Sequence, residues 1–311
     1  MGEAARRPAQ MRRIHANLLM LCAALIWGVT FSIQQLAMEH IPPSWFTGIR
    51  FVLGALVVLP LALRERHIKS VRESWTLDRG AWPWMVATGG ALFLGALFQQ
   101  YGIEHTTVAN AGFLTALYVP LTPIIAFFIL RQHPHPTIWA AALACLVGAY
   151  MMSGSTLDAL NVGDVWVVLG ALFWAIHILL VGYITPRTGA PFHVACVQFS
   201  VVGGLGLLVG AMVEDITVQA IVNAAPMIAF SGLLSVGMGF TLQVVAQKHT
   251  PPADAAVILS AETVFAALAG AIILGESLGV LQWSGGALIL SGVLAVELLP
   301  LVFRQPRSGP T

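Results

Sequence analysis

The sequence predicts an all-α polytopic membrane protein of ten transmembrane helices, and three observations carry this prediction. Of the 311 residues, 58% are hydrophobic and 9% are charged, whereas a soluble domain carries about 25% charged residues. Apolar runs of about 20 residues, enough to cross a hydrocarbon core some 30 Å thick, recur along the chain. Finally, residues 99–152 align without a gap on residues 243–296. We therefore expect two five-helix repeats within a lipid bilayer.

The first repeat is expected at residues 14–153, after an Arg-rich tail at residues 1–13. A Pro42-Pro43 turn separates its first two apolar runs, and a charged loop at 64–79 precedes the third. A short turn at His105 and Thr106 leads into the fourth run. The expected spans of this repeat are 14–36, 44–63, 81–103, 108–130 and 137–152.

The second repeat is expected at residues 165–300, after a connection at 154–164 that contains Ser, Gly and Asp. A polar tail at 301–311 follows it. The expected spans are 165–184, 192–213, 225–247, 253–274 and 280–300. Equivalent residues of the two copies include Trp27 with Trp174, Arg50 with Gln198, Thr106 with Thr250, Tyr118 with Glu262, and Gly148 with Gly292.

The basic residues predict that both termini are cytoplasmic, because Lys and Arg accumulate in cytoplasmic loops. With the N-terminus inside and ten spans, every Lys and Arg except Arg50 falls in a cytoplasmic segment. Since each copy has an odd number of spans, the second copy must be inserted upside down. An inverted repeat of this kind places a substrate site near the bilayer midplane, between the copies. The N-terminal residues do not resemble an organelle transit peptide, which favours a multi-pass protein of a cell inner membrane.

The second copy resembles the EamA-type members of the drug/metabolite transporter superfamily. The resemblance covers nearly the whole chain and rests on Glu262-Thr263, the Leu-Gly-Glu at 274–276, Gly285-Gly286 and Gly292. It implies that the third, fourth, eighth and ninth spans form the centre and that the fifth and tenth are peripheral. Such proteins mostly move small metabolites, often outward. Thr263 stands where the family usually has Pro, so these residues do not settle whether the ninth span is interrupted.

Glu262 is the sharpest candidate for contact with a substrate. It lies about nine residues into its span, roughly 14 Å deep at about 1.5 Å per residue. A charge at that depth costs about 2.5–3.5 kcal/mol on insertion scales, so it normally faces a cavity or a partner. One interpretation is a substrate-ammonium contact or a proton-coupling site. The alternative is a structural acid, either protonated or hydrogen-bonded to a neighbouring helix.

Arg50 is the only basic residue within an expected span. Its long side chain either reaches the cavity, where it would attract anionic or zwitterionic substrate groups, or snorkels to the outer interface or bonds a neighbouring helix.

The fourth span carries polar and small residues at helical spacing, which places them on one face. This face is either a cavity lining or a set of interhelical hydrogen bonds. Pro120 and Pro123 lie beside it and are candidate hinges, since Pro frees backbone carbonyls in a membrane helix. The residues of the face are Ala111, Thr115, Tyr118 and Thr122.

Other polar or aromatic residues fall within apolar runs. Trp27 and Trp174 either stack on an aromatic or cationic substrate or pack at a symmetric contact. His177, one turn from Trp174, either carries protons or is a neutral, hydrogen-bonded core residue. Gln99 and Gln243 either line the path or bond between helices.

We expect neither a metal site nor a cofactor. Cys22, Cys145 and Cys196 are far apart within apolar runs, and His133 and His135 lie in a loop without further ligands. The fifth and tenth spans carry small residues four positions apart, which permit close helix packing within one chain or across a homodimer. These residues are Ala140, Ala144 and Gly148, and Ala287 with Ser291.

The favoured function is that of a secondary active transporter, not an enzyme. The sequence lacks a Walker A motif, so transport energy would come from gradients or exchange. We expect alternating access and export of an amino-acid-like or aromatic metabolite, with proton coupling through Glu262. The expected partners are the bilayer, the small-molecule substrate and the proton, without nucleic acid. The alternatives are an importer or exchanger of a vitamin or nucleotide-like solute, an intramembrane enzyme, or a sensor.

Overall fold

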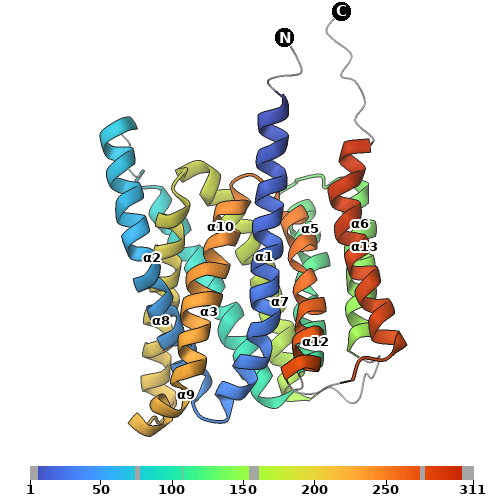
Figure 1. Ribbon diagram of the computed structural model, residues 1–311. Helices are drawn as coiled ribbons and strands as arrows, with labels where there is room; N and C mark the ends of the chain where they lie inside the picture. Colours follow the sequence, from blue (N-terminus) through green and yellow to red (C-terminus); the bar gives the residue numbers. More distant parts are fainter. Residues whose placement is uncertain (1–5, 74–77, 107, 154–160, 274–276, 303–311) are drawn as a thin grey trace, which may run out of the picture.

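The computed structural model describes residues 6–73, 78–106, 108–153, 161–273 and 277–302, and their regular structure is entirely helical (Figure 1). The elements are α1 (Arg6–Met38), α2 (Pro43–Glu73), α3 (Ala81–His105), α4 (Val108–Thr115), α5 (Tyr118–Phe128), α6 (Pro136–Met152), α7 (Val162–Thr188), α8 (Pro191–Val213), α9 (Val218–Phe230), the π-helix η1 (Ser231–Phe240), α10 (Thr241–Gln247), α11 (Pro252–Leu259), α12 (Ala261–Ile273) and α13 (Val280–Val302).

Within the described residues, eight helical stretches are long and apolar enough to cross a membrane, and α6 and α13 contain two shorter apolar stretches. The prediction of an all-helical polytopic membrane protein is confirmed at this level. In Figure 1, α1 begins and α13 ends at the same end of the bundle, while α6 and α13 lie side by side at one edge.

Several helices extend beyond the expected spans because polar segments continue as helix. The charged loop expected at 64–79 is helical as far as Glu73, since it carries good helix formers without Gly or Pro in this part. The expected tail at 1–13 is helical from Arg6. Helix α9 begins at Val218 rather than Ala225, because the Thr217 side chain caps it by accepting from the Ala220 amide at 3.1 Å. Residues 1–5 and 303–311 of the expected tails and residues 154–160 of the expected connection lie outside the described residues.

The expected fourth span is interrupted between α4 and α5, at Ala116 and Leu117. Pro120 lacks the amide that would bond the Ala116 carbonyl in a continuous α-helix. The Val119 amide bonds that carbonyl instead, at 3.0 Å, which tightens the turn. The helix is therefore interrupted just before Tyr118.

The expected ninth span is also interrupted, at Ser260, although Thr263 stands in place of Pro. The Ser260 hydroxyl donates to the Val257 carbonyl at 2.6 Å, and the Thr263 amide bonds the Ser260 carbonyl at 3.1 Å. Back-bonding by Ser of this kind bends helices. Ser260 is the repeat equivalent of Ala116, so both copies break at the same position by different local chemistry.

The eighth span changes its winding, from α9 through η1 to α10. Gly232, Gly237 and Gly239 let side chains of neighbouring helices approach η1 closely, and a Cβ at Gly239 would lie 2.8 Å from Trp27 Nε1. The wider π-helical turn also leaves the Ser235 carbonyl as an acceptor for Trp27 Nε1 at 3.3 Å. Stretches of π-helix are frequent at functional sites.

Helices α2 and α8 pack antiparallel, and each caps the other. The Glu214 carboxylate, at the end of α8, accepts from the backbone amides of Ser44 and Trp45 at the start of α2. The Glu65 carboxylate of α2 accepts from the His193 amide, at the start of α8, at 3.0 Å. Carboxylates at helix N-termini are favourable because unpaired amides and the helix dipole point at them.

Helices α6 and α13 approach closely through glycines. A Cβ at Gly148 would lie 2.6 Å from the Gly285 carbonyl oxygen, and one at Gly292 would lie 3.1 Å from the Ala141 carbonyl oxygen. These two contacts relate equivalent residues of the two copies. The expected small residues Ala140, Ala287 and Ser291 are exposed and do not form this contact.

This packing predicts that Gly148→Ala destabilises the protein by about 1–3 kcal/mol, the usual cost of overpacking. The measurement is thermal unfolding of the protein purified in detergent. Gly204→Ala is the matched control, because a Cβ at Gly204 meets no atom within 4 Å. Equal melting temperatures for the two variants would contradict the described α6–α13 contact.

Candidate functional site

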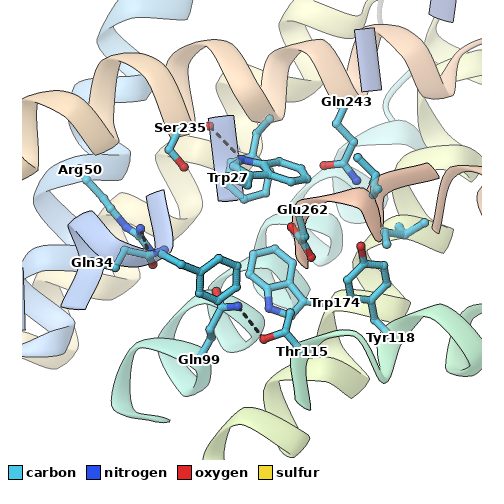
Figure 2. Close-up of a pocket in the computed structure, with 14 residues that line it drawn as sticks. Trp27, Gln34, Arg50, Gln99, Thr115, Tyr118, Trp174, Ser235, Gln243 and Glu262 are labelled. Atoms are coloured by element: carbon cyan, nitrogen blue, oxygen red, sulfur yellow. Dashed lines mark hydrogen bonds between the residues drawn. The ribbon is translucent and has the colours of Figure 1, made fainter. Parts of the chain in front are cut away.

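A cavity lies in the middle of the bundle, between α1, α2, α3, α7, the two interrupted spans and the eighth span (Figure 2). The cavity volume is about 50 Å³, which is room for a few waters. The lining residues are Trp27, Phe31, Gln34, Arg50, Gln99, Thr115, Tyr118, Trp174, Ile178, Ser235, Phe240, Gln243, Leu259 and Glu262.

Eight of the nine candidate substrate contacts lie in this lining, although they come from distant parts of the chain. The exception is His177, which is fully buried behind the wall. One of its ring nitrogens, Nε2, lies 2.9 Å from Gln198 Oε1 on α8. Its position corresponds to the core-residue alternative rather than to a contact with the cavity.

Glu262 is placed by the interruption of the ninth span. It lies in the first turn of α12, directly after the break at Ser260, and 7% of its surface is exposed. Figure 2 shows its carboxylate directed into the cavity beside the Tyr118 hydroxyl. Among the described residues, the Glu262 carboxylate has no ion-pair partner.

Arg50 supplies the positive charge of the lining and is 4% exposed. Its Nη1 donates to Gln34 Oε1 at 2.8 Å, while its Nε has no partner. The guanidinium carbon lies over two rings of α2, 4.9 Å from the Phe46 centroid and 5.4 Å from the Phe51 centroid. These contacts hold the head group inside the bundle, and within the described part of the chain no carboxylate pairs with it.

Phe240, at the end of η1, organises the aromatic part of the wall. The Trp174 ring stacks on it with a centroid distance of 5.7 Å and an interplanar angle of 10°. Trp27 packs against the same ring at 4.5 Å and 48°. The repeat-equivalent tryptophans are thus brought together by a residue whose own equivalent in the first copy is Ala96.

Two amides complete the polar lining. Gln99 Nε2 donates to Thr115 Oγ1 at 2.9 Å, which links α3 to α4 just before the break. Gln243 Nε2 donates to Gln247 Oε1 at 2.9 Å, and Gln243 Oε1 has no partner. An unpartnered buried acceptor is costly, so it favours a donor from a bound molecule or water.

A family model described as the EamA-like transporter family matches residues 14–154 and 161–298. The chain belongs to this family. It is therefore a multi-pass membrane protein of a transporter family, which acts within a lipid bilayer on small molecules.

This EamA-like transporter is similar to several proteins along nearly its whole length. It is 30% identical over 290 residues to a protein of Archaeoglobus fulgidus named an uncharacterized transporter, covering 93% of this chain and 87% of the relative. It is 25% identical over 295 residues to the uncharacterized transporter YwfM of Bacillus subtilis, covering 91% and 94%. It is 22% identical over 290 residues to YedA, named an uncharacterized inner membrane transporter of Escherichia coli, covering 90% and 89%.

A crystal structure with 20% sequence identity matches the fold of this EamA-like transporter with a TM-score of 0.76. The match covers 94% of this chain and 99% of the other. At that identity, the likeness shows the shared fold alone.

Six lining residues of this EamA-like transporter were not among the sequence-based candidates. Gln34 was detectable, because an amide inside an apolar run needs a partner. Phe31, Ile178, Leu259 and Phe240 are apolar and look like any core residue in the sequence. Ser235 depends on the π-helix, which no local pattern predicted.

The histidine pair at 133 and 135 has a structural explanation in this EamA-like transporter. The His135 side chain caps α6 by accepting from the Thr137 amide at 3.3 Å. His133 packs edge-on against Phe127, with a centroid distance of 5.4 Å. Within the described residues, no group of three or more His, Cys, Asp or Glu side chains is arranged to hold a metal ion.

Proposed function

We propose that this protein is a secondary active transporter that exports a small zwitterionic metabolite, amino-acid-like or aromatic, by alternating access. The observation that carries the proposal is a cavity lined by a carboxylate and a guanidinium that do not pair with each other. Figure 2 shows Glu262 and Arg50 on separate parts of the lining.

The energetics of the two charges favour a ligand that carries both signs. A buried ion without a partner costs several kcal/mol in proteins. A substrate ammonium at Glu262 and a substrate carboxylate at Arg50 would offset this cost for both. Arg forms its strongest contacts to carboxylates through a pair of parallel donors. Gln34 occupies Nη1, and the unpartnered Nε belongs to the other side of the guanidinium.

The aromatic wall favours a substrate with an apolar or aromatic part. Trp27, Trp174 and Phe240 present ring surface to the same cavity that holds the two charges. Ring surface of this kind binds cations and aromatic groups. With room for only a few waters, the described conformation would have to expand to admit such a molecule.

Alternating access between two inverted halves is supported by features that recur in both copies. The two interruptions fall at equivalent positions, Ala116 and Ser260, and α2 and α8 cap one another in antiparallel fashion. Broken helices at the substrate site are frequent in transporters with inverted repeats. We propose that Pro120 and Pro123 are hinges, that both termini are cytoplasmic, and that the membrane is a cell inner membrane.

Proton coupling through Glu262 completes the proposal, since this carboxylate lies in the lining without an ionic partner. A proton and a substrate ammonium would then compete for it. The glycines of α6 and α13 pack against each other within the chain. A homodimer through α6 or α13, which we also propose, would therefore use the outer faces of these helices.

The test is flux of labelled amino acids, aromatic metabolites, nucleotides and vitamins into liposomes that contain the purified protein. If labelled phenylalanine is transported, unlabelled phenylalanine should compete at least tenfold better than two analogues. These are phenethylamine, which lacks the carboxylate, and 3-phenylpropionate, which lacks the ammonium. The factor follows because one charged hydrogen bond is worth about 1.5–3 kcal/mol. Equal competition by all three would contradict the zwitterion assignment. Flux of nucleotides or vitamins alone would favour the other class of solute.

A further inference from the structure

One end of the bundle carries a polar contact at the start of the interrupted fourth span. Thr106, directly after α3, donates its hydroxyl to Asp164 Oδ1 at 2.7 Å. The Asn110 side chain of α4 donates to the same oxygen at 2.9 Å. Asp164 lies in the first turn of α7 and is held there by a reciprocal cap with Asn161. The contact therefore joins α4 of the first copy to α7 of the second.

The opposite end carries the equivalent contact for the interrupted ninth span. Thr250 donates its hydroxyl to Asn17 Oδ1 of α1 at 2.8 Å. One turn earlier on α1, Arg13 forms an ion pair with Asp254 of α11. This contact joins α11 of the second copy to α1 of the first.

The two contacts are built from repeat-equivalent residues. Thr250 is the equivalent of Thr106, Asp254 of Asn110, and Asp164 of Asn17. Each contact therefore links the half-helix that leads to a central break with the first span of the other copy. Because successive spans alternate in direction, the two contacts lie at opposite ends of the bundle. The cavity lies between them, and both contacts are formed in the same structure.

We propose that these two contacts are the gate latches of the transporter, each holding the cavity closed at its own end. The first latch consists of Thr106, Asn110 and Asp164, and the second consists of Thr250, Asn17, Arg13 and Asp254. The inference rests on the proposed alternating access, and it assigns to named residues the two closures that such a cycle requires. Releasing one latch shifts the protein toward the state open at that end.

The two latches differ in chemistry, although their residues occupy equivalent positions in the two copies. The first is a single carboxylate that accepts from two neutral donors. The second combines a neutral hydrogen bond with an ion pair. An ion pair that is partly exposed is weakened by salt, so high salt selectively favours opening at the end that carries the second latch.

The test is a cysteine-labelling experiment that needs no substrate. Ser235→Cys places a reporter in the cavity, in a chain whose native Cys22, Cys145 and Cys196 are replaced. A membrane-impermeant sulfonated methanethiosulfonate is applied to right-side-out and to inverted membrane vesicles. Thr106→Val and Thr250→Val then remove the equivalent hydroxyl from opposite ends. Each should raise labelling from one face, by about fivefold for one hydrogen bond, and the two variants should favour opposite faces.

Thr88→Val is the matched control, because the Thr88 hydroxyl is buried and bonds only the Trp84 carbonyl of its own helix at 2.7 Å. It should leave the ratio of labelling from the two faces unchanged. Asp254→Asn should act in the same direction as Thr250→Val. The double variant Arg13→Asp with Asp254→Arg exchanges the two charges and should restore the ratio of labelling from the two faces. A folding defect would not be reversed in this way.

The proposal is overturned if the two threonine variants change labelling from the same face, or by no more than Thr88→Val does. Flux of a labelled solute in liposomes is measured on the same variants. Unchanged labelling ratios together with intact flux would reject the latches and leave the transporter assignment standing. Absence of flux in the unaltered chain, with opposite labelling shifts in the variants, would reject the assignment and keep the latches.

Discussion

Replacing Glu262 by Gln should lower the rate of substrate transport in liposomes at least tenfold and remove its dependence on pH. The side chain is the carboxylate of the cavity lining, and no cation of the described protein offsets its charge. A substrate ammonium would gain a charged hydrogen bond there, worth about 1.5–3 kcal/mol, or roughly 10- to 150-fold in binding. Gln keeps the size of the side chain and a carbonyl acceptor but neither binds nor releases a proton. The measurement is initial flux of a transported amino acid at several pH values.

Glu39→Gln is the matched control for this variant, since it makes the same change at an exposed carboxylate. It should leave both the rate and the pH profile unchanged. Full pH-dependent transport by Glu262→Gln would show that the proton is carried elsewhere. A reduced rate with an unchanged pH profile would keep Glu262 as a substrate contact and exclude it as the coupling site.

The second large effect is expected for Arg50→Gln, which should raise the substrate concentration for half-maximal transport by a factor of ten or more. The loss should be confined to substrates with a free carboxylate, so that phenylalanine competes no better than phenethylamine. Arg50→Lys should recover only part of the affinity, because an ammonium keeps the charge but not the planar pair of donors. Gln34→Leu should weaken binding less, since it removes the bond at 2.8 Å that orients the guanidinium.

Arg64→Gln serves as the control, because Arg64 is an exposed residue of the same helix. Thermal unfolding in detergent separates a binding defect from a folding defect. Removal of the buried guanidinium should not destabilise the protein strongly, because its charge is buried at a cost that no ion pair offsets. Unchanged discrimination between phenylalanine and phenethylamine in Arg50→Gln would exclude Arg50 from the carboxylate site.

The duplication made a large part of this architecture predictable from the sequence. Aligning the copies indicated that Tyr118 and Glu262 are equivalent, and the structure places both in one cavity, each just after a break. Polar residues inside apolar runs were also informative, because burial of Arg50, Gln99 or Gln243 requires a partner or a cavity. Such residues predict a cavity or a partner because an unsatisfied polar group inside the bilayer is energetically costly.

Other features depend on three-dimensional packing that the sequence does not reveal. The break at Ser260 coincides with a hydroxyl that bonds its own helix, but Ser291 makes the same kind of bond within the uninterrupted α13, so this pattern does not mark a break in the sequence. Phe240 becomes the centre of the aromatic wall only because η1 turns it toward Trp27 and Trp174. The sequence left open whether His177 carries protons or is a neutral core residue, and the structure places it outside the cavity lining, bonded to Gln198 on α8. The contact between α6 and α13 uses Gly285 rather than the expected Ala287, because helix rotation is set by packing partners.

Counterflow in liposomes tests the central claim most directly. Vesicles that contain the purified protein are loaded with a high concentration of unlabelled phenylalanine, or of whichever solute the flux screen identifies, and diluted into a trace of the labelled solute. An alternating-access transporter should accumulate label transiently above its external concentration, because each inward step returns with an unlabelled molecule. The overshoot should disappear in Glu262→Gln and Arg50→Gln. Flux without an overshoot, linear in solute concentration, would contradict alternating access and indicate a channel-like pathway instead.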